Sequence, residues 1–528
     1  MLKSSGAMAA ATLTSRVLGM VREMAYMAFM NVGWVNDAFQ YAFTIPNLFR
    51  RLLGEGALTA AFIPIFKEKE KIHGEMEMWR AANAVISGLV VTATVIIAIV
   101  MLAISAALSI HHFPDKTELM LQLLRVMFPY MLLVCVAAAM MGMLNARGHF
   151  FIPAMGATML NVVMIASVYW LAPKFGLNLP PDQRLPVQIF ALAYGVLAAG
   201  VAQAAFQMPT LWKDGFRYRW VSPWRDETVR KVVMRMIPGT IGLAAFQINV
   251  ALVQLIGFFV ATGVVSSFNG AVRLMELPQG MFGISLATYL LPTLSGLAAD
   301  KNYPEFRATL RHGLSTLIFV NLISSVLLVT LAEPIVRLIY EHGKFTEGST
   351  LRVAGALEYL APGLVMFSTV NILARAFYAL GDTRTPMKIS IVCLVLNLAV
   401  AIIMLVPLHE EERGPAIANT ITSCGNVGLL LFALRKKLGK LEMEAMRTNT
   451  LRLICLAILA GVIAFMGWKF WDEKLGHATV ALKIGAVFVP AILAGAPYWV
   501  AAVAFKIPAA TEIFEFASAR FKKRSPKS

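Results

Sequence analysis

Residues 90–108 read VVTATVIIAIVMLAISAAL, an uninterrupted apolar stretch without a charge. A helix of about 20 apolar residues is long enough to cross the roughly 30 Å hydrocarbon core of a bilayer. Comparable runs occur at 387–406 and 480–503. Over all 528 residues, 58% are hydrophobic and 15% are charged, with a mean hydropathy of +0.69. Since soluble domains contain about 25% charged residues, the composition predicts a polytopic membrane protein.

The apolar segments predict an all-α protein with 14 transmembrane helices. We expect them at residues 8–30, 35–66, 81–108, 119–144, 154–172, 187–211, 237–260, 264–297, 313–331, 353–379, 387–406, 415–434, 451–469 and 480–503. Two of these segments, 35–66 and 264–297, are longer than a bilayer requires. Pro46 and Gly54 in the first, and Pro278 in the second, are candidate bend points.

The charge distribution predicts the orientation in the membrane. Three basic residues at span ends, Lys388, Arg452 and Lys469, are counted with the adjacent loops. Of the 47 Lys and Arg residues, 30 then fall on the side that carries both termini, 9 on the other side and 8 deeper within spans. Positive charge collects in cytoplasmic loops, so we expect both termini in the cytoplasm. This asymmetry accounts for most of the net charge of +17 without nucleic-acid binding.

An internal repeat divides the sequence. Pro129, Gly148 and Pro153 recur 233 residues later as Pro362, Gly381 and Pro386. The repeat predicts two lobes of six helices each, plus two additional C-terminal helices. The expected boundaries are 1–212 for the first lobe, 213–236 for a cytoplasmic linker, 237–440 for the second lobe, 441–505 for helices 13 and 14, and 506–528 for a basic tail.

Five arginines lie in segments that otherwise resemble membrane spans: Arg16, Arg22, Arg50, Arg51 and Arg273. A charge at the bilayer centre costs about 2.5–3.5 kcal/mol on insertion scales, and such residues normally face a protein interior or a wet cavity. Several such cations predict an anionic substrate. The alternatives are snorkelling of Arg16 to the interface, a cytoplasmic anchor at Arg50 and Arg51, and a structural pair of Arg273 with Glu276.

Acidic residues nearby offer partners for these arginines when no substrate is bound. Glu23, Asp37 and Glu55 are the candidates in the first lobe, and Glu276 lies one turn beyond Arg273. Such pairing would limit the cost of buried unpaired charge.

Four stretches resemble the MurJ/MviN family: SRVLGMVRE (15–23), NDAF (36–39), IPNLFRRLLGEGALTAAFIPIF (45–66) and RLMELPQGMFGISLATYLLP (273–292). The family comprises lipid II flippases within the multidrug, oligosaccharidyl-lipid and polysaccharide exporter superfamily. The resemblance implies a cavity between two lobes, with its essential arginines at Arg16, Arg22, Arg50 and Arg273. It also implies acidic partners at Asp37 and Glu55, and a groove for the polyprenyl tail formed by helices 13 and 14.

The resemblance therefore implies a flippase that moves lipid II, an undecaprenyl-pyrophosphate-linked disaccharide-pentapeptide, from the cytoplasmic to the periplasmic leaflet by alternating access. Alternatives are a cation-coupled drug exporter or a flippase for another polyprenyl-linked glycan. An enzyme is not expected, since the sequence has neither a P-loop nor a DDxxD motif. We expect membrane lipids and other cell-wall synthesis proteins as partners. We expect no metal, no cofactor and no nucleic acid. The sequence leaves open whether membrane potential, a monovalent cation or product removal drives transport.

Overall fold

The computed structural model describes residues 2–52, 57–224, 226–441, 444–512 and 515. Within those residues every regular element is a helix, which confirms the all-α prediction. The chain divides into two compact units, Met1–Ser266 (unit 1) and Ser267–Ser528 (unit 2).

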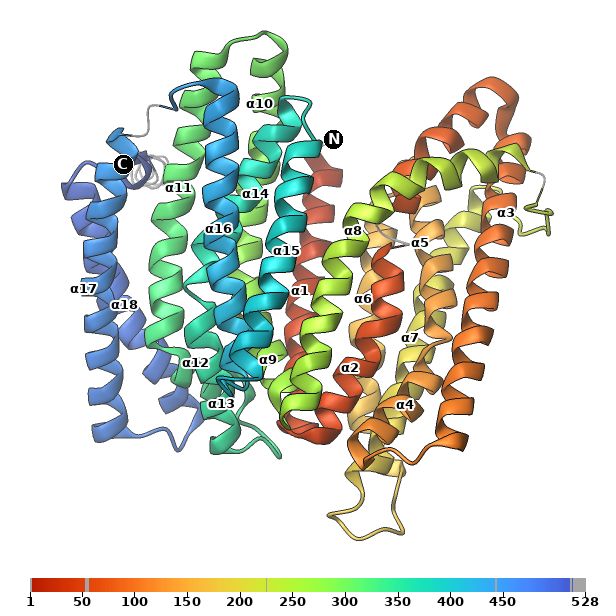
Figure 1. Cartoon of the computed structure of the whole chain (residues 1–528), viewed down its shortest axis with the longest axis horizontal. Coiled ribbons are helices and arrows are strands. Elements are labelled where there is room, and N and C mark those ends of the chain that lie inside the picture. Colours follow the sequence, from red (N-terminus) through yellow and green to blue (C-terminus); the bar gives the residue numbers. More distant parts are fainter. Residues whose placement is uncertain (1, 53–56, 225, 442–443, 513–514, 516–528) are drawn as a thin grey trace, which may run out of the picture. The chain divides into compact units, whose positions relative to one another are not determined.

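The helices of unit 1 follow one another along the chain as α1 (Leu2–Met30), α2 (Trp34–Phe49), α3 (Ala57–Ile110), α4 (Asp115–Met127), α5 (Tyr130–Ala146), α6 (Phe151–Ala166), η2 (Ser167–Leu171), η3 (Ala172–Lys174), α7 (Leu185–Lys213) and α8 (Glu227–Val260). A helix at the boundary, α9 (Val264–Pro278), leads into unit 2 (Figure 1).

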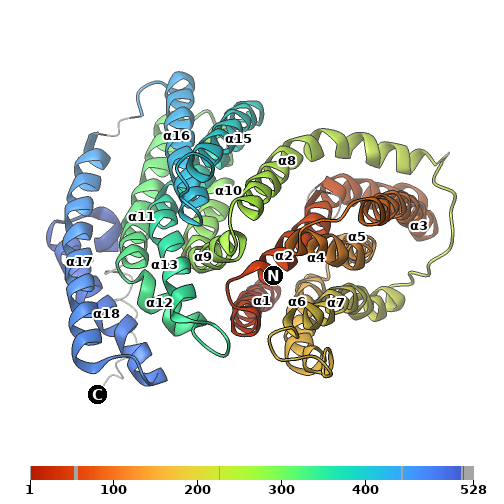
Figure 2. The ribbon, with the colours of Figure 1, turned by 60° about the horizontal axis from the view of Figure 1, so that its bottom comes forward.

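Unit 2 continues with η4 (Gln279–Ile284), α10 (Ser285–Ala299), α11 (Tyr303–Thr330), α12 (Ala332–Tyr340), α13 (Glu347–Leu360), α14 (Gly363–Ala379), α15 (Arg384–Leu405), α16 (Arg413–Leu438), α17 (Glu444–Leu475) and α18 (Val480–Ala504). Figures 1 and 2 both show α17 and α18 side by side at one edge of the unit, with α11 next to α17.

Each predicted span has a helical counterpart in this order. By length and hydropathy, nine helices of the described residues could cross a membrane, or up to eleven if two bent pairs each form one span. The chain is thus a multi-pass membrane protein, while the number fourteen and the boundaries at 212, 237 and 441 stay predictions.

The internal repeat is visible in the backbone. The predicted helices 119–144 and 353–379 are each broken into two, α4 with α5 and α13 with α14, which meet at 42° and 47°. The breaks fall at Pro129 and Pro362, the residues that the repeat pairs. Proline has no N–H and clashes with the preceding turn. At the second break, side-chain hydroxyl groups donate to backbone carbonyls beside the proline, such as Ser325 Oγ to Ala361 O at 2.8 Å, which also accepts from the N–H of Leu364 at 3.0 Å.

The two long segments each contain a π-helical turn. The turn η4 follows Pro278 and separates α9 from α10, so the predicted span 264–297 is interrupted where its proline and glycines lie. In the first segment, residues 50–52 are π-helical. The candidate bend point Gly54 lies outside the described residues. π turns inside helices are frequent at functional sites.

Two expectations about loops were wrong. Residues 67–80 were expected to form a cytoplasmic loop, but they belong to α3, whose helical geometry is broken at Gly74 alone (φ 82°). Glycine adopts this left-handed region without strain, so one residue turns the helix back on itself as a hairpin. The stretch between 331 and 353 was also expected to lack a helix, yet it contains α12.

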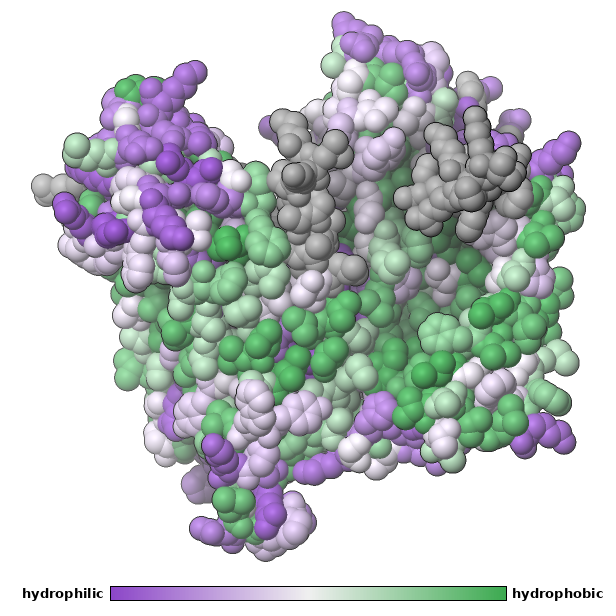
Figure 3. Space-filling view, turned by 180° about the vertical axis from the view of Figure 1, so that it is seen from behind, coloured by the Kyte–Doolittle hydropathy of each residue, from purple (hydrophilic) through white to green (hydrophobic). Residues whose placement is uncertain are grey.

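Hydrophobic side chains gather along the helices of each unit, and hydrophilic ones gather at the ends. In Figure 3 the α3 hairpin of unit 1, at upper left, is hydrophilic, and a hydrophobic zone lies beneath it. This is the surface that a helix bundle presents to a bilayer.

Candidate functional site

Arg22 is a buried cation on α1 with only part of its hydrogen-bonding capacity used. Its side chain is 8% exposed. NH1 donates to Oδ1 of Asn161 on α6 at 3.1 Å, and NH2 lies 3.7 Å from the carboxylate of Glu23, which is also buried. The guanidinium stands 5.4 Å from the ring centroid of Tyr26, within cation–π range. Its Nε has no hydrogen-bond partner among the described residues.

Asn161 holds the arginine in this position. Its amide nitrogen donates to the carbonyl of Ser15 on α1 at 3.2 Å, while its oxygen accepts from Arg22. Both bonds connect α6 to α1. The sequence analysis did not identify Asn161, although a polar residue in an apolar span is a recognisable signal.

Arg50 and Arg51 occupy the π turn that follows α2. Nε of Arg50 donates to Oδ1 of Asn47 at 2.7 Å, and Arg51 donates to Oε1 of Gln247 on α8 at 3.4 Å. Both arginines are half-buried. Arg16 is also half-buried, on α1, whereas Glu55 lies outside the described residues.

Asp37 binds a lysine and a helix terminus. Its carboxylate, fully buried, lies 3.1 Å from Nζ of Lys116 on α4. It accepts hydrogen bonds from the backbone N–H groups of Gly263 (2.6 Å) and Ser266 (2.9 Å), at the start of α9. A carboxylate at a helix N-terminus satisfies donors that the helix leaves open.

Lys116 completes this arrangement from the other side of the turn. Its ammonium donates to the carbonyls of Phe258 and Ala261, where α8 ends, at 2.6 and 3.2 Å. A cation therefore lies at the C-terminus of α8 and an anion at the N-terminus of α9, as the helix dipoles favour. The sequence analysis proposed Asp37 as a partner for the arginines and did not consider Lys116.

Arg273 belongs to unit 2 and pairs with Glu276 on the same helix, NH1 to Oε2 at 2.8 Å. Their side chains are 41% and 47% exposed. An exposed pair of this kind contributes at most about 1 kcal/mol to stability.

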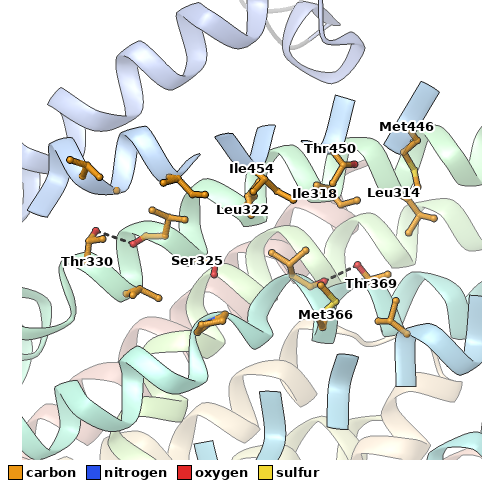
Figure 4. A pocket seen from close by; sticks show the side chains of 18 of the residues that line it. Leu314, Ile318, Leu322, Ser325, Thr330, Met366, Thr369, Met446, Thr450 and Ile454 are labelled. Atoms are coloured by element: carbon orange, nitrogen blue, oxygen red, sulfur yellow. Dashed lines mark hydrogen bonds between the residues drawn. The ribbon is translucent and has the colours of Figure 1, made fainter. Parts of the chain in front are cut away.

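A large apolar groove lies in unit 2 (Figure 4). Its volume is about 690 Å³. It is bounded by α11, α14, α16 and α17, and its wall includes Ile318, Leu322, Val365, Met366, Ile454 and Ile458.

Three polar side chains of this groove, Ser325, Thr330 and Thr369, donate to backbone carbonyls. The hydroxyls of Thr330 and Thr369 donate to carbonyls of their own helices, at 2.9 and 2.7 Å. At Gly461, a Cβ would stand 2.7 Å from Val326, so α17 approaches α11 closely there. The result is a hydrocarbon-like surface suited to an apolar chain.

A buried arginine that the sequence analysis placed in a loop connects α12 to the last two helices. Arg337, 3% exposed, lies among four carboxylates: Glu333 at 2.9 Å, Glu341 at 3.2 Å, Glu347 at 3.4 Å and Asp472 at 3.8 Å. Asp472 belongs to α17, and Lys483 of α18 pairs with Glu341 at 3.2 Å. Burial opposes ionisation of Glu341, but hydrogen bonds from Thr350 and Lys483 outweigh it and hold its pKa below the usual value.

The comparisons with known proteins agree with one another. The family model for Lipid II flippase MurJ matches residues 26–483. A probable lipid II flippase MurJ of Haemophilus influenzae is 32% identical over 80% of this chain and 84% of its own length. Its counterpart in Rhizobium tropici is 30% identical over 93% of this chain and 92% of its own.

Among solved structures, a lipid II flippase MurJ in an inward closed conformation superposes with a TM-score of 0.75. It covers 94% of this chain and 99% of its own length at 22% identity. That likeness establishes the fold.

Proposed function

Because the chain belongs to the Lipid II flippase MurJ family, we propose that it carries lipid II across a bacterial membrane by alternating access. The observation that best supports this is the buried Arg22, which keeps one nitrogen without a partner among the described residues. An unsatisfied charged donor inside an apolar bundle costs free energy, and an incoming anion relieves that cost.

The pyrophosphate of the substrate is the proposed anion. Guanidinium groups bind phosphate oxygens in a bidentate manner and stay protonated in any cellular compartment. We assign this task to Arg22, Arg50 and Arg273, with Arg16 and Arg51 contributing from α1 and the π turn. Glu23, 3.7 Å from Arg22, is proposed to offset the charge when no substrate is bound.

The undecaprenyl tail is proposed to occupy the apolar groove between α17 and the helices α11, α14 and α16. Burial of apolar surface stabilises such a complex by about 25 cal/mol per Å². The ion pairs Arg337–Asp472 and Lys483–Glu341 support this role, because they fix the α17–α18 hairpin against α12.

The chain is placed in the cytoplasmic membrane with both termini inside, as the charge distribution of its loops favours. We propose that it performs no covalent chemistry and binds no resident cofactor. Transport would then draw on the membrane potential, a monovalent-cation gradient or removal of product outside. Other cell-wall synthesis proteins are proposed partners.

Complementation tests the proposal. The chain is expressed in a bacterium depleted of its own lipid II flippase, and accumulated lipid II is measured. Growth with normal lipid II is expected. The substrate would be reassigned if the chain inserted normally and failed to rescue this strain but rescued one lacking a different polyprenyl-glycan flippase. Export of organic cations alone would support the drug exporter.

A further inference from the structure

The segment that joins α7 to α8 has an unusual composition. Residues 216–224 read FRYRWVSPW, and we call them the arginine–tryptophan segment. Residues 216–222 have no regular secondary structure. Nothing in the proposed transport cycle uses them.

The backbone of this segment is fixed along α3. Asn83 donates to the carbonyl of Arg217 at 3.1 Å, and the N–H of Val221 donates to Ser87 at 3.4 Å. The hydroxyl groups of Ser87 and Tyr218 are 3.2 Å apart. Phe216 is buried against Trp79, with ring centroids 5.5 Å apart. The segment is therefore an ordered strip and not a loose linker.

While the backbone, Phe216 and the Tyr218 hydroxyl contact α3, the two tryptophan side chains are exposed. Trp220 is 59% exposed, Trp224 77% and Tyr218 48%, and Arg217 and Arg219 between them are exposed as well. Tryptophan and tyrosine with this exposure are enriched where a membrane protein meets the headgroup layer, since their rings are apolar and their N–H or O–H groups are polar.

The position along α3 agrees with that layer. The contacts at Asn83 and Ser87 lie just beyond Arg80, the last charged residue of the hairpin, and just before the apolar stretch 90–108. At 1.5 Å per residue, Ser87 is about 10 Å further along the helix than Arg80. The strip thus follows the boundary between the hydrophilic hairpin and the hydrophobic zone seen in Figure 3.

The acidic residues beside the strip do not neutralise the charge of its arginines, because each is bound to another group. Asp214 pairs with His149 at 3.1 Å, Asp226 accepts the first backbone N–H groups of α8, and Glu227 pairs with Lys231 at 2.7 Å. Arg217 donates to two backbone carbonyls, which carry no net charge. The strip therefore presents concentrated positive charge together with indole rings.

We propose that the arginine–tryptophan segment binds the headgroups of anionic phospholipids, with its arginines on the phosphodiesters and its tryptophans at the acyl boundary. The site is distinct from the one proposed for lipid II and does not depend on it. Only the choice of leaflet, the cytoplasmic one, rests on the proposed orientation.

A lipid titration tests the charge component. The full-length protein in detergent is titrated with phosphatidylglycerol, with phosphatidylcholine as the zwitterionic reference, and thermal unfolding is followed. Each basic residue near an anionic surface contributes about fivefold in affinity. Arg217→Gln/Arg219→Gln should therefore raise the phosphatidylglycerol concentration for half-maximal stabilisation about 25-fold.

The matched control removes the same charge from the α3 hairpin, as Lys67→Gln/Lys71→Gln, and should leave the titration unchanged. An equal loss in the control would reduce the effect to general surface charge and overturn the proposal. Arg22→Ala should keep the phosphatidylglycerol response although it loses lipid II, which separates this site from the transport site.

Fluorescence tests the depth. In vesicles containing brominated phospholipids, tryptophan emission is compared between the wild type and Trp220→Phe/Trp224→Phe. The emission that the two substitutions remove should be the part that bromines near the glycerol backbone quench in the wild type. Emission from these two residues that no brominated lipid quenches would place them in water and overturn the assignment to lipid, in favour of a soluble polyanion.

Discussion

The turn after α5 and the turn after α14 are equivalent positions of the two repeats, and they show what the duplication has retained. Each begins with a glycine at positive φ, Gly148 at 88° and Gly381 at 72°. The next residue reaches the sixth helix of its own repeat: His149 contacts Asp214 at the end of α7, and Asp382 contacts Lys437 on α16. The contact is the same, but the acidic and basic partners have changed places.

The same contrast holds for larger features. Both repeats bend at a proline. The first buries Arg22 and the Asp37–Lys116 pair, whereas the second buries Arg337 and also contributes α11, α14 and α16 to an apolar groove. Under the proposed function the side chains of the two repeats divide the work, with most of the headgroup arginines in the first repeat and the groove for the tail against the second. The following substitutions test that division, from the largest expected effect to the smallest.

Asp37→Ala should cause the largest loss of stability. Removing one partner of a buried pair costs about 3–5 kcal/mol, and here it leaves Lys116 and the start of α9 without their anion. Thermal unfolding of the purified protein measures the effect. Asp115→Ala removes the same charge from an exposed site one residue from Lys116 and should change the free energy of unfolding by no more than about 0.5 kcal/mol. Equal behaviour of both variants would show that the buried pair is unimportant.

Arg22→Ala should abolish lipid II binding while the protein still inserts. Losing one charged contact to a desolvated phosphate costs about 2–5 kcal/mol, a loss of roughly 30-fold to several thousand-fold in affinity. Arg50→Ala and Arg273→Ala should act alike. Lysine at position 22 should retain partial binding, because it keeps the charge and loses the planar fork.

Native mass spectrometry of lipid II complexes measures these losses. The exposed Arg125 provides the control, and Arg125→Ala should bind nearly as well as the wild type. Undiminished binding in all three alanine variants would remove the arginines from the site.

A bulky residue in the groove should weaken only the part of lipid II binding that comes from the undecaprenyl tail. Ile454→Trp inserts a larger side chain between α17 and α11, at a typical cost of about 1–3 kcal/mol, which is about 5- to 150-fold in affinity. Binding of a headgroup analogue without the tail should stay unchanged. Leu459→Trp, on the exposed side of α17, is the control. Equal losses for the tailed and tail-less ligands would contradict the division between the repeats.

Loss of the Asp382–Lys437 contact, in the turn of the second repeat, should have the smallest effect on stability. The Lys437 ammonium and the Thr385 backbone N–H hold the pKa of Asp382 well below its usual range. A carboxylate with a lowered pKa contributes stability that is fully present above its unfolded-state pKa, about 3.9, and that is lost as the pH falls through the lower pKa of the folded state.

Because the pair is partly exposed, its contribution should not exceed about 1 kcal/mol. Asp382→Asn should therefore lower stability slightly at pH 7 and by a smaller amount near pH 3. Thermal unfolding at both pH values checks this, and a larger loss at pH 3 than at pH 7 would refute it.

Features encoded by single residues were predictable from the sequence. Pro129 and Pro362 indicated the repeat, and the helices of both repeats bend at these residues. Pro278 indicated the interruption of a long span. Arg22 stood out because a charge in an apolar run needs an explanation. These signals are local, since each depends on the conformational or solvation properties of one side chain.

Features that depend on pairs distant in the sequence were not predictable. Asp37 and Lys116 are far apart in the chain, and only the folded unit shows that they enclose the α8–α9 turn. Arg337 gained its four carboxylates from three helices. The α3 hairpin was not predicted for a different reason. Its many charged residues are typical of a loop, and a single glycine such as Gly74 occurs in helices and loops alike.

Transport of lipid II by the wild-type chain and by Arg22 variants tests the central claim most directly. In cells depleted of their own flippase, the fraction of lipid II accessible from outside is measured at matched membrane abundance. The account predicts wild-type accessibility for the chain itself, an intermediate value for Arg22→Lys and background for Arg22→Ala. Wild-type accessibility with Arg22→Ala would contradict it.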